Sequence, residues 1–119
     1  MSTILLIDDD VQLAAAITDL FELDGHAVIT AHNGRQGLDR LHRGAPPSLI
    51  LLDLAMPEMD GWEFLRQKSA DPAIADIPTV VMSGSIAERP EGVIDFFRKP
   101  VDTARLRSLV SRLSNQAPS

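Results

Sequence analysis

Side chains capable of chemistry follow four of the apolar runs in this sequence. Asp8 and Asp9 come after the first run, Asp53 after the third, Ser83 ends the fourth, and Lys99 follows the fifth. A carboxylate can act as a nucleophile, a hydroxyl can donate a hydrogen bond, and an ammonium can neutralise a phosphoryl oxygen. Each of them alone has an ordinary explanation, such as a helix cap, a turn or a solvated lysine. Their shared position after buried runs indicates a site.

Three carboxylates in one place need a counter-charge. If Asp8, Asp9 and Asp53 lie within a few ångströms, they repel one another and their pKa values rise unless a cation neutralises them. Ligand sets made only of oxygen select Mg²⁺, or Mn²⁺, over zinc. A carboxylate nucleophile, a divalent cation, a lysine and a hydroxyl are the parts needed for phosphoryl transfer to an aspartate. We expect Asp10 only to cap the following helix.

Five short apolar runs predict strands that bring these residues together. Several are continuously apolar, which is typical of strands buried on both faces of a parallel sheet, whereas the last contains Asp95 and is expected at an edge. Helical patterns separate the strands, so we predict an α/β fold with a flavodoxin-like five-stranded parallel sheet, strand order 2-1-3-4-5, and helices on both faces. In such sheets ligands bind beyond the carboxyl ends of the strands. The predicted strands are Ile4–Ile7, Ala27–Ala31, Leu49–Leu52, Thr79–Met82 and Ile94–Phe97.

The predicted helices begin behind residues whose side chains make good N-caps. These are Asp10 or Asp9, Asn33, Asp60 and Asp102. In the helix after Asp60, Trp62 and Leu65 are expected to face the core. The whole chain, residues 1–119, is predicted to form one domain with a frayed tail at 114–119.

Composition narrows the classes of function. Eleven basic and seventeen acidic residues give a net charge of −6, which disfavours direct binding to nucleic acid. There is no cysteine, and no apolar run is long enough to cross a membrane. His26, His32 and His42 lack metal-ligand spacing. These features suit a protein of the cytoplasm without membrane contact.

Four motifs resemble the receiver domains of bacterial two-component response regulators: ILLIDDD, LILLDLAMPEMDGWEFL, PTVVMSG and DFFRKP. They occur in the family's order and together span essentially the whole chain. The resemblance implies that Asp53 is the phosphoacceptor. It also implies that Asp9 and Asp53 bind Mg²⁺ directly with the backbone carbonyl of Ala55, while Asp8 acts mainly through water.

The resemblance implies further roles near the site. Ser83 and Lys99 contact phosphoryl oxygens, the peptide bond before Pro100 is cis, and Phe96 moves inward together with Ser83 when the domain switches between two states. The donor is then a phosphohistidine on a histidine kinase or a phosphotransfer protein, and the output partner is unknown. The chain would be a phosphoacceptor regulator that catalyses only its own phosphorylation and dephosphorylation.

Two features depart from the family pattern. Phe96 stands where many members have tyrosine, which gives the ring less reason to stay in contact with water. Lys99 follows Ser83 by only sixteen positions, and Pro90 and Gly92 in between disfavour a long helix. We therefore expect the fourth helix to be short or absent and the segment Ser85–Gly92 to be mobile or atypical.

The sequence also leaves other functions open. Asp8 and Asp10 have the D-x-D spacing of aspartate-nucleophile phosphatases of the haloacid dehalogenase kind, but the chain has no room for a cap and Asp53 would be unexplained. A degenerate receiver acting only as a binding module is disfavoured because every expected site position is filled. A flavin-binding module is disfavoured because this chain lacks the phosphate-binding loop that such a module needs after the first strand.

Overall fold

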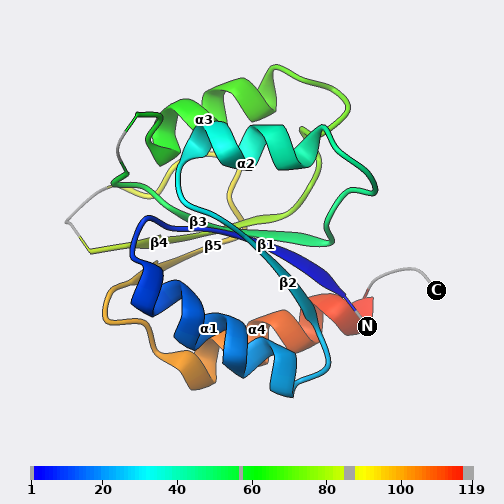
Figure 1. Cartoon of the computed structure of the whole chain (residues 1–119), viewed down its shortest axis with the longest axis vertical. Coiled ribbons are helices and arrows are strands. Elements are labelled where there is room, and N and C mark those ends of the chain that lie inside the picture. The colour runs from blue at the N-terminus through cyan, green and yellow to red at the C-terminus, as the bar shows by residue number, and fades with distance from the viewer. Residues whose placement is uncertain (1, 57, 85–87, 117–119) are drawn as a thin grey trace.

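Five parallel strands form the centre of the protein (Figure 1). The computed structural model describes residues 2–56, 58–84 and 88–116. The sheet order is β2-β1-β3-β4-β5, as predicted, and β5 with Asp95 lies at an edge. The strands are β1 (Thr3–Ile7), β2 (Ala27–Ala31), β3 (Leu49–Asp53), β4 (Thr79–Ser83) and β5 (Asp95–Arg98).

Four helices cover the sheet within the described residues. Figure 1 shows α2 and α3 on one face and α1 and α4 on the other. The predicted three-layer α/β architecture is therefore confirmed. The helices are α1 (Val11–Leu23), α2 (Gly34–Leu41), α3 (Gly61–Ser69) and α4 (Thr103–Gln116).

Alternate residues of the inner strands supply two apolar cores. Ile4 and Leu6 pack with α1 and α4, whereas Leu5 and Ile7 pack with α2 and α3. All four side chains are at most 1% exposed. Burial on both faces explains why this run is continuously apolar instead of alternating. The cores hold the strand ends that carry the polar residues.

The predicted caps begin the helices. Asp10 Oδ1, Asn33 Oδ1 and Asp60 Oδ1 accept hydrogen bonds from the backbone N–H three residues later, at 3.0, 2.9 and 3.0 Å. Asp102 does the same for the N–H of Arg105 at 3.1 Å. Asp10 rather than Asp9 caps α1, which leaves Asp9 available to the site.

The prediction that Trp62 of α3 faces the core is wrong, whereas Leu65 does pack, partly buried, against the core. Trp62 is 45% exposed, and the most buried side chains of α3 are Phe64 and Lys68, at 0% and 6% exposure. Gly61 explains the difference, because a Cβ there would lie 2.6 Å from the carbonyl oxygen of Asp53. The helix therefore starts with Gly61 against β3, and positions three and seven residues later share that face, while Trp62 lies roughly a third of a turn away from it.

The connection from β4 to β5 contains no helix in its described residues, Gly84 and 88–94, so the prediction of a short or absent fourth helix is confirmed. The segment lies on the same side of the sheet as α2 and α3 (Figure 1). Residues 85–87 of the expected atypical segment lie outside the described residues. The last helix continues three residues beyond Leu113, into the stretch expected to be frayed.

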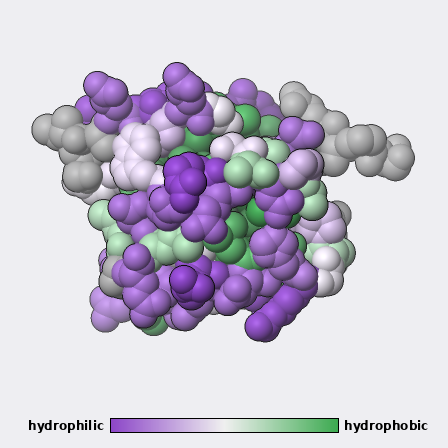
Figure 2. All heavy atoms as spheres, turned by 90° about the horizontal axis from the view of Figure 1, so that it is seen from above, coloured by the Kyte–Doolittle hydropathy of each residue, from purple (hydrophilic) through white to green (hydrophobic). Residues whose placement is uncertain are grey.

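The surface over α2 and α3 is mostly hydrophilic, with hydrophobic side chains visible only in patches (Figure 2). No helix in the described parts of the chain combines the length and the apolar character needed to span a bilayer.

Candidate functional site

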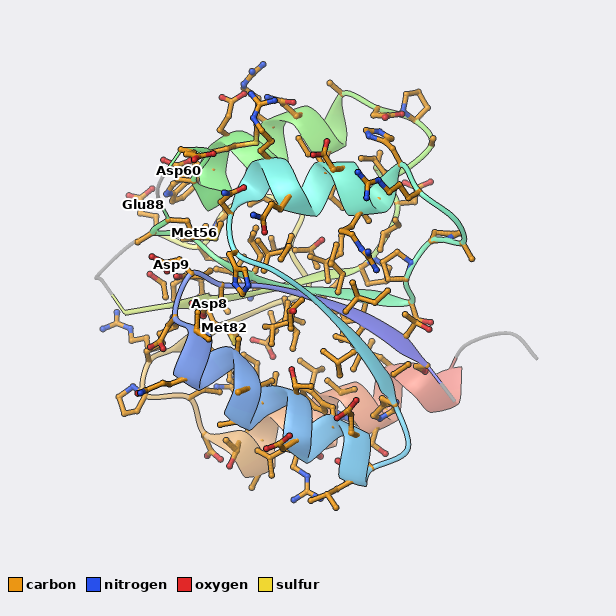
Figure 3. All side chains as sticks on the ribbon, in the orientation of Figure 1. Asp8, Asp9, Met56, Asp60, Met82 and Glu88 are labelled. Atoms are coloured by element: carbon orange, nitrogen blue, oxygen red, sulfur yellow. The ribbon has the colours of Figure 1, made fainter. Side chains whose placement is uncertain are left out.

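Three carboxylates meet at the carboxyl ends of β1 and β3. Oxygens of Asp8, Asp9 and Asp53 all lie within 4.8 Å of one another. Asp8 is 0% and Asp53 3% exposed, whereas Asp9 is exposed. Figure 3 shows the labelled Asp8 and Asp9 where β1 turns into α1. The sequence-based expectation that these residues come together therefore holds in the structure.

Strand pairing explains this convergence. β1 and β3 are parallel neighbours with Ile7 beside Leu52, so the next residue of each strand, Asp8 and Asp53, comes to the same place. β1 is also where the chain order reverses, since β2 lies on one side of it and β3 on the other. Open parallel sheets have their ligand sites at such a point.

Lys99 adds a cation to the cluster. Its Nζ donates to Asp8 Oδ2 at 2.8 Å and lies 3.5 Å from Asp53 Oδ2. Burial opposes the charge of Lys99, but the contacts with Asp8 and Asp53 outweigh it, so the pKa of the lysine is raised. Lys99 is therefore charged at neutral pH.

Asp53 has a strongly raised pKa. Burial and the neighbouring charge of Asp8 raise its pKa to about 6, while Lys99 and the Ala55 N–H, 3.4 Å from Oδ1, act in the opposite direction. When all three aspartates are ionised, three negative charges face one ammonium, a surplus of two. Such a cluster favours a bound cation.

The donor set suits a hard divalent cation. All three side chains offer carboxylate oxygen, the type of ligand that Mg²⁺ and Mn²⁺ prefer. Their oxygens lie within 4.8 Å of one another, so these residues would be able to hold one cation between them. The carbonyl of Ala55, two residues after Asp53, stays a predicted ligand.

The other residues assigned to the site from the sequence belong to the neighbouring elements: Ser83 ends β4, Phe96 lies in β5, and Pro100 follows β5. Ser83 is 1% exposed at the end of β4, and its carbonyl accepts a hydrogen bond of 2.8 Å from the N–H of Lys99. The bond between Lys99 and Pro100 is cis, the isomer that the resemblance implied. Phe96 is partly buried, pairs with Val81 and packs on the core beneath α2 and α3. The inward movement of Phe96 stays a prediction.

Further residues at this end of the molecule were not assigned to the site from the sequence. Figure 3 shows Met56, Asp60 and Glu88 on the same side of the molecule as Asp9. Met56 and Asp60 belong to the motif around Asp53, which could have identified them. Glu88 lies in the irregular connection after β4, where no motif marks it.

Comparison with known proteins places these features in a family. Residues 4–111 match the model of the response regulator receiver domain. The chain is 30% identical over 117 residues to protein PilH of Pseudomonas aeruginosa, covering 93% of this chain and 96% of PilH. It is 35% identical over 123 residues to the transcriptional regulatory protein CpxR of Escherichia coli, covering 94% of this chain and 50% of CpxR. The chain thus spans about half of CpxR.

Solved structures agree with this assignment. The signal receiver domain of a signal transduction histidine kinase from Syntrophus aciditrophicus superposes with a TM-score of 0.86 at 29% identity, covering 100% of this chain and 95% of that one. The receiver protein from Pseudomonas putida gives 0.86 at 26% identity, over 93% and 96% of the two chains.

Proposed function

This chain belongs to the receiver domains of two-component response regulators, and we propose that Asp53 accepts a phosphoryl group with Mg²⁺ held by Asp8, Asp9 and Asp53. One observation carries the proposal: three carboxylates within 4.8 Å of one another, with the ammonium of Lys99 in contact with two of them. This arrangement supplies a nucleophile and the means to neutralise an incoming anion.

The proposed reaction forms an acyl phosphate. A carboxylate oxygen of Asp53 attacks phosphorus, the bond from phosphorus to the imidazole nitrogen of a phosphohistidine breaks, and the leaving imidazole takes up a proton. Mg²⁺, when bound, neutralises charge on the carboxylates and on the phosphoryl oxygens. The protein supplies a buried, ionised Asp53 in a fixed position.

The raised pKa of Asp53 supports the need for a cation. Only the ionised carboxylate is a nucleophile, and burial beside Asp8 disfavours that form. Lys99 alone leaves two surplus negative charges, so an approaching phosphoryl group would meet net repulsion. A divalent cation cancels this surplus.

Lys99 and Ser83 are the proposed partners of the phosphoryl oxygens. Lys99 Nζ is already 3.5 Å from Asp53 Oδ2, and its backbone is tied to the carbonyl of Ser83. Phosphorylation would draw the ammonium from Asp8 toward Asp53. We propose that Ser83 and Phe96 then change conformation together and transmit the signal.

The proposed partners follow from this chemistry. A histidine kinase or histidine phosphotransfer protein supplies the phosphoryl group in the cytoplasm, and a second protein reads the phosphorylated state. CpxR is described as a transcriptional regulator, but the net charge of −6 argues against direct DNA binding by the present chain. The chain is proposed to act as a regulator and not as an enzyme with a separate substrate.

Incubation with phosphoramidate and Mg²⁺, followed by intact-mass measurement, tests the proposal. We expect the gain of one phosphoryl group, blocked by a chelator and absent in Asp53→Asn. Asp19→Asn, on the exposed side of α1, is the matched control and should label as the wild type does. Continuous hydrolysis of a generic phosphatase substrate would instead support an aspartate-nucleophile phosphatase, and no labelling would support a binding module.

A further inference from the structure

A pocket of about 270 Å³ lies between α3 and the irregular segment that connects β4 to β5. Trp62, Lys68 and Ser69 line it from α3, Thr79 from the start of β4, and Pro90 and Gly92 from the opposite side. Thr79 begins the strand that ends in Ser83, so the pocket lies away from the carboxylate cluster. The absence of a helix in the described part of this connection shapes the pocket.

Lys68 is the unusual residue of this pocket. Its side chain is buried, and its Nζ donates a 2.7 Å hydrogen bond to the carbonyl oxygen of Ala75, which also lines the pocket. Among the residues that the structure describes, no carboxylate lies within 4.0 Å of this ammonium. Burial lowers the pKa of Lys68, and the charge of Asp76 opposes this only in part.

Within the described residues, the carbonyl of Ala75 is the one acceptor in contact with the Lys68 ammonium. An ammonium has three N–H donors and loses much of its hydration when buried. The stem of the lysine packs on the core face of α3, which explains its burial but not the choice of a charged end over methionine or leucine. An entering carboxylate would both accept hydrogen bonds and neutralise the charge.

The size of the pocket favours one side chain over a small-molecule ligand. Pockets for drug-sized ligands occupy about 300–1,000 Å³, so 270 Å³ lies just below that range. Trp62, 45% exposed, provides an amphipathic wall of the kind that anchors protein interfaces. The other charges contribute little, since Arg66 is paired with Glu63 and Glu91 is exposed to solvent.

We propose that this pocket receives an acidic side chain of a protein partner, with its carboxylate on Lys68 and its methylene groups against Trp62. Charge complementarity selects the carboxylate, and a pocket of about 270 Å³ has room for a side chain of this size. The interaction is separate from Asp53, so this proposal stands or falls independently of phosphoryl transfer.

Nuclear magnetic resonance with capped amino acids tests the proposal. N-acetyl-glutamate N-methylamide is the probe, and the corresponding glutamine compound is its neutral control at matched ionic strength. The chain contains two lysines and one tryptophan, so ¹⁵N labelling of lysine Nζ and of the indole N–H gives separate signals for Lys68 and Trp62. Typical affinity per ligand atom predicts a dissociation constant on the order of millimolar for such a probe.

We expect the glutamate probe to shift the Lys68 Nζ and Trp62 indole signals saturably, with affinity about tenfold or more above that of the glutamine probe. Lys68→Met should abolish the Trp62 response, whereas Arg112→Met, which removes an exposed charge from α4, should retain it. Equal responses to the two probes, an unchanged response in Lys68→Met, or no saturable shift at tens of millimolar would each overturn the proposal. If Lys68→Met does not fold, the proposal is decided by comparing the Lys68 Nζ shifts that the glutamate and glutamine probes cause in the wild-type protein.

Discussion

Nζ of Lys99 lies 2.8 Å from Oδ2 of Asp8 but 3.5 Å from Oδ2 of Asp53. The lysine is therefore engaged mainly with the fully buried Asp8 and only loosely with the proposed phosphoacceptor. This leaves Asp53 the less compensated of the two carboxyls, consistent with its raised pKa.

Removing the ammonium should destabilise the metal-free protein. In Lys99→Met, Asp8 stays buried without its cation, which typically costs about 3 kcal/mol or more of unfolding free energy. Urea unfolding at neutral pH measures this change. Arg107→Met, which removes the exposed pair with Asp24, is the matched control and should change stability little. Equal stability of Lys99→Met and the wild type would mean that the Asp8 contact contributes nothing.

The stability of the metal-free protein should carry a pH-dependent contribution from Asp53. Its pKa rises from 3.8 to about 6 on folding, so the folded state holds the proton more tightly than the unfolded state. This contribution is fully present below pH 3.8 and is lost as the pH rises through about 6. Two pKa units correspond to about 3 kcal/mol of unfolding free energy.

Asp53→Asn isolates that contribution from those of other carboxyls. The asparagine variant should be more stable than the wild type at neutral pH, and the difference should vanish near pH 4. Mg²⁺ should reduce the difference, since it stabilises the ionised wild type. Parallel unfolding curves for the two proteins at every pH would show that Asp53 has an ordinary pKa.

Gly61 should be required for the position of Asp53. A Cβ at this residue would lie 2.6 Å from the Asp53 carbonyl oxygen and 2.7 Å from Cα of Leu54, backbone atoms that cannot yield locally. Gly61→Ala should therefore cost about 1–3 kcal/mol and weaken Mg²⁺ binding. In Gly84→Ala the nearest atom is Cδ of Lys99 at 3.8 Å, so this control should lose less stability. Unchanged stability and unchanged Mg²⁺ binding in Gly61→Ala would refute the close packing of α3 on β3.

Phe96 should change rotamer when the site binds Mg²⁺ and beryllofluoride. The ring packs partly buried beside Val81, and it has no hydroxyl group that could hydrogen-bond to water at the protein surface. Side-chain ¹³C spectra of the phenylalanines, with and without beryllofluoride and Mg²⁺, report the rotamer populations. Unchanged populations would remove Phe96 from the switch.

The sequence allowed the sheet order and the convergence of Asp8, Asp9 and Asp53 to be predicted. Runs such as that around Leu5 and Leu6 are apolar on both faces, which only a strand inside a covered parallel sheet requires. The parallel order then brings Asp8 and Asp53 to one edge, and the N-caps follow from local hydrogen bonds. The apolar runs and the N-caps are both local in the sequence, so they can be recognised without knowledge of tertiary contacts.

Features set by tertiary contacts were missed. Trp62 was expected inside because it is large and apolar, but Gly61 docks α3 in a rotation that buries Lys68 instead. Periodicity alone does not distinguish these rotations when the helix is only nine residues long.

The central claim, that Asp53 becomes an acyl phosphate, is tested most directly by trapping that group chemically. Borohydride reduces an aspartyl phosphate to homoserine, and peptide mass spectrometry then locates the converted residue. After treatment with phosphoramidate and Mg²⁺, we predict homoserine at position 53 and intact aspartates at positions 8 and 9. Conversion at Asp8 or Asp9, or no conversion in a protein that binds Mg²⁺, would contradict the account.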